Sequence, residues 1–342
     1  MNYYIYILFS PLMIFSIFLI FMSNSWFSMW MIMEINLISY LSIIIFDKNI
    51  KNEIPLMYFI IQSFNSYMFL LSSLMLSFMN YKLMMMFLMM MNFSMLIKLS
   101  IFPFHLWYIK MFKSMSWMNL FLFSTLQKII PLFILFNMLM LMMNLNNFLL
   151  INLNLLIIMF SSLMCSLIGL NQTDLKLIFS YSSMIQISWV IILMIFNEEY
   201  SMIYFIIYSI IMMNLFMLFN SLNSNSLMNL SILKFKFSMK MLMLMLSMMS
   251  LASLPPMMGF LMKWISLTEM ISKMSITINF MMILNSIIST YFYFRIMFLS
   301  IMMYFETKKT NFKFINLNQL INKNIMNLSM LMFFMLLIYE MF

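Results

Sequence analysis

The feature that most constrains this chain is a series of long apolar runs that recurs along its whole length. Eleven runs approach or exceed the roughly 20 residues that an α-helix needs to cross a lipid bilayer. We predict spans at about 2–22, 25–46, 54–79, 83–110, 116–143, 148–170, 174–196, 199–220, 238–272, 275–303 and 325–342. Barrel strands would alternate polar and apolar residues over about ten positions, whereas these runs are continuous. The sequence therefore predicts an all-α integral membrane protein.

Composition excludes several other classes of protein. Only 8% of the residues are charged, against about 25% in an ordinary soluble domain. The two glycines, Gly169 and Gly259, cannot form a glycine-rich phosphate loop. The single cysteine, Cys165, excludes an internal disulfide, and the single histidine, His105, excludes a histidine-built haem or metal site. The longest predicted loops, 221–237 and 304–324, are short, so we expect one membrane domain over residues 1–342.

The amino-acid usage also indicates where the chain is made. It has 54 Met and 39 Phe but a single Arg, a single Ala and a single Val. This bias is typical of an AT-rich organellar genome in which an extra codon is read as Met. The N-terminus enters an apolar run without an Arg-rich transit peptide. We therefore expect synthesis inside an organelle.

The basic residues of the predicted loops predict an orientation in the membrane. Alternating loops place twelve lysines on the side of the N-terminus: Lys48, Lys51, Lys110, Lys113, Lys176, Lys234, Lys236, Lys240, Lys308, Lys309, Lys313 and Lys323. The other side receives Lys82 and Lys273. Because positive loops face the compartment of synthesis, we expect the N-terminus in the matrix-equivalent compartment of the organelle and, with eleven spans, the C-terminus on the opposite side. The net charge of +9 is thus explained by topology, and a nucleic-acid partner is not expected.

Four ionisable residues lie deep within the predicted spans and are the candidate functional residues. They are Glu34, Lys98, Lys128 and Lys263. A charge at this depth costs roughly 2.5–3.5 kcal/mol even on the gentlest insertion scale. Three lysines cannot all pair with one acid, and a lysine in apolar surroundings gives up its proton more readily unless a carboxylate is near. These residues therefore favour a proton pathway, and the alternative is a set of ion pairs that lock helices together.

Two further polar residues permit either a functional or a structural interpretation. His105 follows Pro103 in the fourth span, close to Lys98, where a proton-relay role and a structural role are both open. Arg295 lies about two turns from the end of its predicted helix, and its long side chain is expected to reach the membrane surface.

Prolines interrupt two of the predicted spans. Pro103 falls in the fourth span and the doublet 255–256 falls in the ninth. Proline removes a backbone donor and breaks a helix. Since the two broken spans are five helices apart, the second lies in the opposite orientation, as in transporters built from inverted repeats. We therefore expect two inverted five-helix repeats with two discontinuous helices, at about 1–143 and 148–303, plus an extra C-terminal helix at 325–342.

Four sequence stretches resemble a known family. Residues 98–107 read KLSIFPFHLW and resemble K-L-x-x-x-P-F-H-x-W, and residues 254–264 read LPPMMGFLMKW and resemble L-P-P-x-x-G-F-x-x-K-W. GLNQT at 169–173 with YSS at 181–183, and SNSW at 23–26 with EIN at 34–36, complete the set. These motifs are similar to those of the antiporter-like membrane subunits of respiratory complex I, in the animal, insect-like mitochondrial form. The resemblance covers essentially the whole chain.

The resemblance implies a role, a location and partners. It implies a proton-translocating subunit of an enzyme in the mitochondrial inner membrane, with Glu34 and Lys98 as the glutamate–lysine pair, Lys128 as the connecting lysine and Lys263 as the lysine of the second broken helix. NADH, FMN, iron–sulfur clusters and ubiquinone are implied in partner subunits, with no cofactor and no metal bound by this chain. The implied partners are antiporter-like, small core and supernumerary subunits of the complex, together with membrane lipids.

The chain departs from the family pattern at two places. The family usually has Pro-Glu shortly after the position of Trp107, where this chain has Ile109 and Lys110. The YSS motif is usually followed by a His, where this chain has Gln186. Relay roles at those positions are therefore not expected here.

Two other functions fit the same spans. A stand-alone cation/proton antiporter would have the same architecture but would purify alone or as a homo-oligomer. A structural membrane scaffold would use the buried charges only to lock helices, so that loss of a lysine would prevent assembly.

Overall fold

The computed structural model describes residues 2–47, 50, 53–76, 81–222, 238–255 and 257–310. Within these ranges every regular element is a helix and none is a strand, which confirms the all-α prediction. Seven helices or helix pairs there are long and apolar enough to cross a membrane. The predicted eleventh span, 325–342, lies outside the described residues, as does Pro256.

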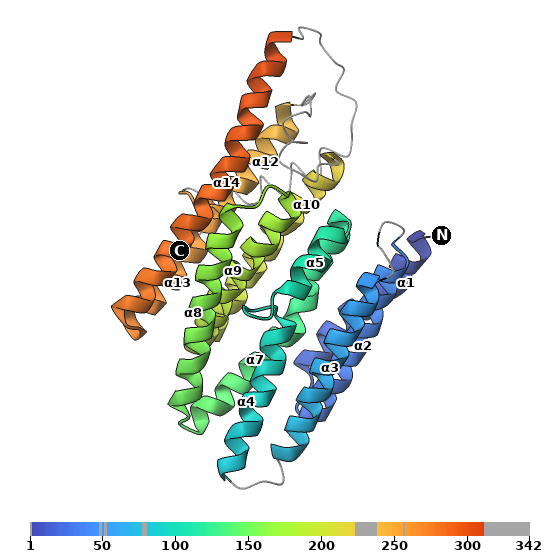
Figure 1. Ribbon diagram of the computed structural model, residues 1–342, viewed down its shortest axis with the longest axis vertical. Coiled ribbons are helices and arrows are strands. Elements are labelled where there is room, and N and C mark those ends of the chain that lie inside the picture. The colour runs from blue at the N-terminus through green and yellow to red at the C-terminus, as the bar shows by residue number, and fades with distance from the viewer. Residues whose placement is uncertain are drawn as a thin grey trace. The chain divides into compact units, whose positions relative to one another are not determined.

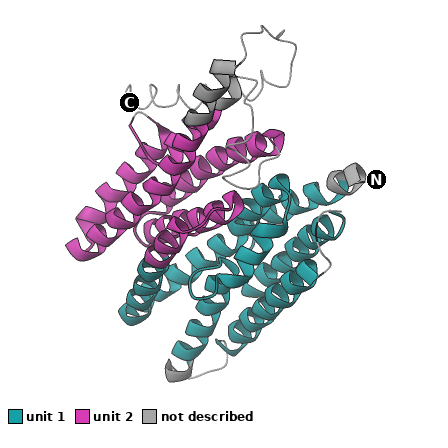
Figure 2. Ribbon diagram, turned by 45° about the horizontal axis from the view of Figure 1, so that its top comes forward, with its two compact units in different colours: residues 1–161 teal, residues 162–342 magenta. Residues whose placement is uncertain are grey.

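The chain divides into two compact units, residues 1–161 and 162–342 (Figure 2). The first unit holds the helices α1 (Asn2–Phe21), α2 (Trp26–Ile45), α3 (Glu53–Leu76), α4 (Tyr81–Lys98), α5 (Leu106–Ser114), α6 (Trp117–Ser124) and α7 (Leu126–Asn144). The boundary falls within α8 (Phe148–Leu170). The second unit continues with α9 (Leu175–Phe196), α10 (Glu198–Leu222), α12 (Ser238–Leu251), α13 (Met258–Lys273) and α14 (Ile276–Thr310) (Figure 1).

The first unit has an aromatic core. In Figure 1, α2, α3 and α4 follow one another side by side, and α5 packs on α3. Phe123 of α6 lies at the centre, stacked on Tyr108 with 4.8 Å between ring centroids and on Tyr40 at 5.8 Å. Tyr58 of α3 meets the same ring edge-on at 6.2 Å. Large rings with offset or edge contacts stabilise a core beyond the area that they bury.

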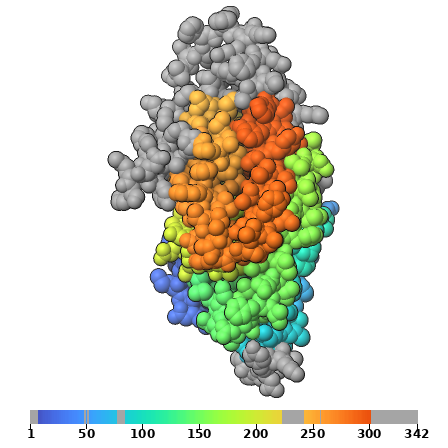
Figure 3. Space-filling model, turned by 90° about the vertical axis from the view of Figure 1, so that its left-hand side faces the viewer, coloured from blue at the N-terminus to red at the C-terminus, as the bar shows by residue number. Residues whose placement is uncertain are grey.

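The second unit is organised around α9. Every residue of its membrane-length window is buried, against 28% for α3 in the first unit. Helices α10, α13 and α14 pack around it. Figure 3 shows the outer face that α12, α13 and α14 form together. Helices α13 and α14 expose large apolar side chains, including Ile271, Phe280 and Tyr291, as expected for a surface that faces lipid or another apolar chain.

Both predicted helix breaks are present and have the same backbone geometry. After α4, Ser100 has a positive φ of 61°, and the amide of Ile101 bonds back to the carbonyl of Leu96 at 3.1 Å. After α12, Ser253 has a φ of 56°, and the amide of Leu254 bonds back to the carbonyl of Met249 at 3.2 Å. This is the Schellman arrangement, which satisfies the last carbonyls of a helix. Each half-helix therefore ends with its own hydrogen bonds completed.

A third break was not predicted. The fifth span, 116–143, was predicted as continuous, but it is divided at Thr125 into α6 and α7. Thr125 has φ −117° and ψ −75°, and its hydroxyl donates to the Phe121 carbonyl at 2.7 Å. The prediction of an uninterrupted helix is wrong here because a threonine that bonds back to the preceding turn competes with the helical ladder.

Candidate functional site

Two of the predicted lysines line one small cavity in the first unit. Lys98, the last residue of α4, and Lys128, in the first turn of α7, are 7% and 3% exposed. The cavity has a volume of about 10 Å³, and its wall is completed by Tyr58, Gln62, Trp107, Tyr108, Phe123, Gln127 and Pro131. A polar cavity needs roughly 10–15 Å³ to hold one water molecule. The fold thus places both lysines at the wall of one polar, water-sized space.

Lys98 has a neutral hydrogen-bond partner. Its Nζ donates to the thioether sulfur of Met33 at 3.2 Å, and Met33 is 4% exposed. Glu34 interacts with Lys98 electrostatically but does not approach it within ion-pair distance in the described structure. The predicted glutamate–lysine pair is therefore near but not closed.

Glu34 lies in the middle of α2 and is half-buried. Its carboxylate accepts a hydrogen bond from the Ser66 hydroxyl of α3. That hydroxyl also lies 2.8 Å from the Ser63 carbonyl of its own helix. The carboxylate is thus held toward α3.

Lys128 lies over an aromatic ring. Its Nζ is 4.4 Å from the centroid of Tyr108, and Tyr108 is stacked on Phe123. A cation over an aromatic face gains about 0.5–2 kcal/mol, more when water is excluded. Trp107, the last residue of the motif at 98–107, and Tyr108, the residue after it, line the same cavity as both lysines.

The sequence analysis missed a neutral polar hub beside the cavity. The carboxamides of Asn36 and Gln127 exchange two hydrogen bonds, of 3.0 and 3.2 Å. The Tyr58 hydroxyl donates to the Gln127 Oε1 at 3.2 Å. These bonds join α2, α3 and α7. The available signal was position, because Asn36 is two residues after Glu34 and Gln127 directly precedes Lys128.

His105 does not line the cavity that the two lysines share. It is 6% exposed and occupies the N-cap position of α5. Its Nδ1 lies 3.2 Å from the Pro103 carbonyl, and its ring stacks on Phe102 with centroids 4.7 Å apart. These contacts favour the structural interpretation, because they attach the histidine to its own break.

Lys263 is the buried lysine of the second unit. It lies in the second turn of α13, is 7% exposed, and its Nζ has no hydrogen-bond partner in the part of the chain that the structure describes. Helix α13 packs on α9, α10, α12 and α14. Gly259 permits this packing, because a Cβ atom there would lie 1.5 Å from the Ser250 carbonyl oxygen of α12.

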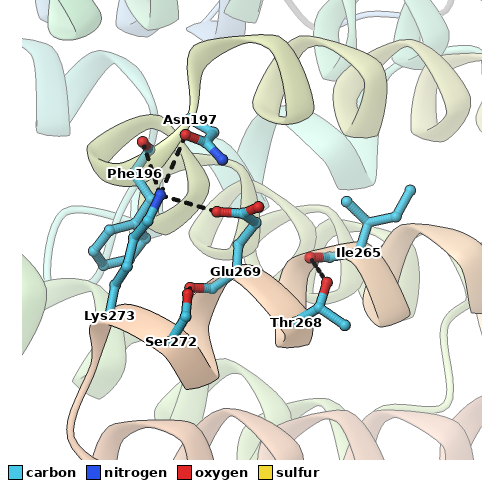
Figure 4. Close-up of polar contacts among 7 residues, drawn as sticks. All are labelled: Phe196, Asn197, Ile265, Thr268, Glu269, Ser272 and Lys273. Carbon is cyan, nitrogen blue, oxygen red and sulfur yellow. Dashed lines mark hydrogen bonds and ion pairs between the residues drawn. The ribbon is translucent and has the colours of Figure 1, made fainter.

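Lys273 on the same helix has an ordinary solvated environment (Figure 4). Its Nζ lies 2.9 Å from the Glu269 carboxylate and 3.3 Å from the Asn197 Oδ1, and its side chain is 39% exposed. It also approaches the Phe196 carbonyl at the end of α9, where the partial negative charge of a helix favours a cation. Helix α13 therefore carries a buried lysine and a solvated one ten residues apart.

Two other polar residues of the second unit have structural partners. Arg295 donates to the carbonyls of Leu170 and Gln172 at 2.7 and 2.6 Å, so it binds the end of α8 instead of only reaching the surface. Gln186, which stands at the family's histidine position, accepts a 2.5 Å hydrogen bond from the Tyr204 hydroxyl. Among the described residues there is no group of three or more His, Cys, Asp or Glu side chains that could hold a metal ion.

The first unit also contains a larger cavity. Its volume is about 460 Å³, and it lies between the end of α1, the start of α2 and the C-terminal half of α7. None of the predicted site residues lines it.

Apolar spans, broken helices and buried lysines define an antiporter-like membrane protein, and comparison with known proteins gives its family. Residues 23–290 match the model of the family described as NADH:quinone oxidoreductase/Mrp antiporter, transmembrane. The chain belongs to this family. It is 33% identical over 288 residues to NADH-ubiquinone oxidoreductase chain 2 of Locusta migratoria, covering 82% of this chain and 81% of the relative. The Anopheles gambiae protein of the same name is 31% identical over 294 residues, covering 83% and 82%.

Solved structures share the fold. A chain of respiratory complex I from Thermus thermophilus matches with a TM-score of 0.82 and 15% identity, over 98% of this chain and 78% of that one. A chain of the Mrp complex from Dietzia matches with a TM-score of 0.74 and 14% identity, over 83% and 58%. At such low identity the likeness concerns the fold alone.

Proposed function

We propose that this chain is the membrane subunit of respiratory complex I that corresponds to chain 2, and that it translocates protons across the mitochondrial inner membrane. The observation that carries the proposal is the cavity shared by Lys98 and Lys128, with Glu34 close by. Charged side chains at this depth in membrane-spanning segments are costly for stability alone. They suit a site that gains and loses protons.

Each buried residue has its own role in this proposal. Lys98 and Lys128 exchange a proton across their cavity, and Glu34 adjusts the affinity of Lys98 for it. Lys263 is the proton-carrying group of the second unit. The redox reaction, from NADH through FMN and iron–sulfur clusters to ubiquinone, takes place in partner subunits, and its energy drives the movement of protons here. His105 serves in this proposal as a relay group secondary to the lysines.

The proposed architecture has eleven spans, with spans 1–5 and 6–10 as inverted repeats. The repeated Schellman geometry at Ser100 and Ser253 supports this repeat. The excess of loop lysines on one side supports an N-terminus in the matrix and a C-terminus in the intermembrane space. The exposed apolar faces are available to membrane lipid and to neighbouring subunits of the complex.

Lysine substitutions in the assembled complex test the proposal. Lys98→Met and Lys263→Met should leave assembly intact, because an apolar side chain of similar length replaces a buried charge, and should lower proton pumping per NADH oxidised. Lys273→Met is the control on α13 and should leave pumping unchanged, because its ion pair is exposed and contributes about 0–1 kcal/mol.

The outcomes distinguish the alternatives. Normal pumping by fully assembled Lys98→Met and Lys263→Met complexes would exclude the pathway. Failure of both variants to assemble would support the scaffold interpretation. Purification of the native chain as a homo-oligomer, without other subunits, would support a stand-alone antiporter.

A further inference from the structure

Each member of the Glu34–Lys98 pair is hydrogen-bonded to a neutral side chain. Lys98 Nζ is bonded to the Met33 sulfur, and the Glu34 carboxylate is bonded to the Ser66 hydroxyl. Met33 and Glu34 are consecutive residues of α2, so their side chains leave that helix about 100° apart. The Lys98 amine, which is bonded to Met33, and the Glu34 carboxylate are therefore held in different directions around α2.

A thioether is a poor partner for an ammonium group. Methionine sulfur is only a weak hydrogen-bond acceptor, whereas a carboxylate accepts strong, charge-assisted bonds. The buried Lys98 amine is thus bonded to the weak acceptor Met33. A stronger acceptor, the Glu34 carboxylate, is close enough to act on it electrostatically. This placement is what one expects if the surrounding helices hold the two groups apart.

We propose that Met33 and Ser66 are positioning residues that keep the Glu34–Lys98 pair separated, and so keep Lys98 able to release its proton toward the cavity. This inference rests on the proposed function and adds two residues to it. A weak acceptor is suited to the task, because it orients the amine without fixing it in the charged form.

The surroundings of Lys98 define what else acts on its charge. The titratable groups that face it are Glu34 from α2 and, around the shared cavity, Tyr58 from α3, Tyr108 from α5 and Lys128 from α7. Lys128 repels a second positive charge. Of these groups only Glu34 attracts the ammonium as a full charge, so it decides what happens when Met33 is changed.

Met33→Leu removes the sulfur and nearly conserves volume, a change that usually costs less than about 1.5 kcal/mol. Lys98 should then approach Glu34, and a closer carboxylate favours the protonated amine. Proton release then needs a higher pH, so the alkaline limb of the pumping profile should move upward by roughly half a unit to one unit. Pumping at neutral pH should fall correspondingly.

Met29→Leu is the matched control. Met29 lies one turn earlier on α2, is also 4% exposed, and its sulfur meets the neutral amide of Asn137 at 3.9 Å. Its substitution should leave the pH profile unchanged. Ser66→Ala is the second test variant, because release of the carboxylate should move the profile in the same direction as Met33→Leu. If Met33→Leu lowers the amount of assembled complex, the pH profile of Ser66→Ala decides whether the inference holds.

The experiment measures pumping rate against pH for the purified complexes in proteoliposomes, from the neutral to the alkaline range. Upward shifts in Met33→Leu and Ser66→Ala, with Met29→Leu matching the native profile, are the expected result. Unshifted profiles in both test variants overturn the inference, as does an equal shift in Met29→Leu. Lys98→Met in the same series separates the two proposals: if it pumps normally, the proposed function itself is wrong.

Discussion

The break between α4 and α5 and the break between α12 and α13 have the same backbone but different electrostatics. Each ends a half-helix with a serine in the left-handed region and the same pair of back-bonded amides. Lys98 is the last residue of the helix before the first break, whereas Lys263 is the sixth residue of the helix after the second break. Lys98 has Glu34 nearby, and Lys263 has no hydrogen-bond partner among the described residues.

The difference between the two lysines comes mainly from Glu34. A helix C-terminus favours a cation by about 0.3–1 kcal/mol, and the effect fades within one turn. Lys263 lies beyond the first turn of α13, so the positive end of the helix dipole repels its charge only weakly. A carboxylate within about 4–6 Å changes the balance between charged and neutral lysine by tenfold or more. A common backbone thus creates two lysine sites with different charged neighbours.

The largest effect is expected from Gly259→Ala. The added methyl group would overlap the backbone carbonyl of Ser250, which cannot rotate away, so α12 and α13 must separate. Overpacking usually costs about 1–3 kcal/mol, and a clash with backbone exceeds that range. Assembled complex should be nearly absent on a native gel. In Gly169→Ala the new atom would meet its neighbours at 3.4–3.5 Å, so near-normal assembly is expected there; equal amounts for the two variants would contradict the close approach at the second break.

Gln127→Leu should produce the next largest effect, and only in the first unit. It leaves the buried groups of Asn36 and Tyr58 without their amide partner. Each buried group left unsatisfied costs about 1–3 kcal/mol. The temperature at which the purified complex loses this subunit should fall. The double variant Asn36→Leu, Gln127→Leu should recover part of the loss, since removing both partners costs less than removing one; a strictly additive loss would show that the two amides are not coupled.

Glu34→Gln should make the first break resemble the second. The amide keeps the size of the side chain and removes the charge that acts on Lys98. Pumping at neutral pH should fall by about threefold to tenfold, because without the carboxylate Lys98 takes up a new proton less readily after each release. The measurement is the ratio of protons moved to NADH oxidised. Glu269→Gln changes an exposed pair on α13 and should have no effect; a matching fall in that control would argue against a specific role for Glu34.

The smallest effects are expected at the two left-handed serines. Glycine adopts positive φ without steric cost, so Ser100→Gly and Ser253→Gly should each stabilise the complex by about 0.5–1 kcal/mol. The two gains should be equal if the breaks share one backbone, as judged by thermal stability. Ser209→Gly, in the middle of α10, should instead destabilise by a similar amount. Opposite signs at Ser100 and Ser253 would contradict the shared geometry.

The helices and two of the breaks could be predicted from the sequence because they depend on local chemistry. The predicted span 148–170 coincides with α8, and Pro103 and the prolines at 255–256 mark both predicted breaks. The break at Thr125 carried no such mark. Pro131, the proline nearest to it, lies inside α7, where the helix accommodates it.

The contacts of the site could be predicted only in part. The depth of Lys98, Lys128 and Lys263 follows from the apolar runs, and burial at 3–7% exposure agrees with it. The contacts of Lys98 with Met33 and of Gln127 with Asn36 depend on how α2, α4 and α7 face one another. That register is set by packing between segments far apart in the sequence, which no local pattern reveals.

The central claim is that the buried lysines lie on a hydrated proton path, and a high-resolution map of the assembled complex tests it most directly. Ordered water should connect Lys98 with Lys128 through their shared cavity, and further ordered water should reach Lys263. Dry surroundings at all three lysines, with each amine paired to a carboxylate of this or another subunit, would contradict the account and leave a structural role.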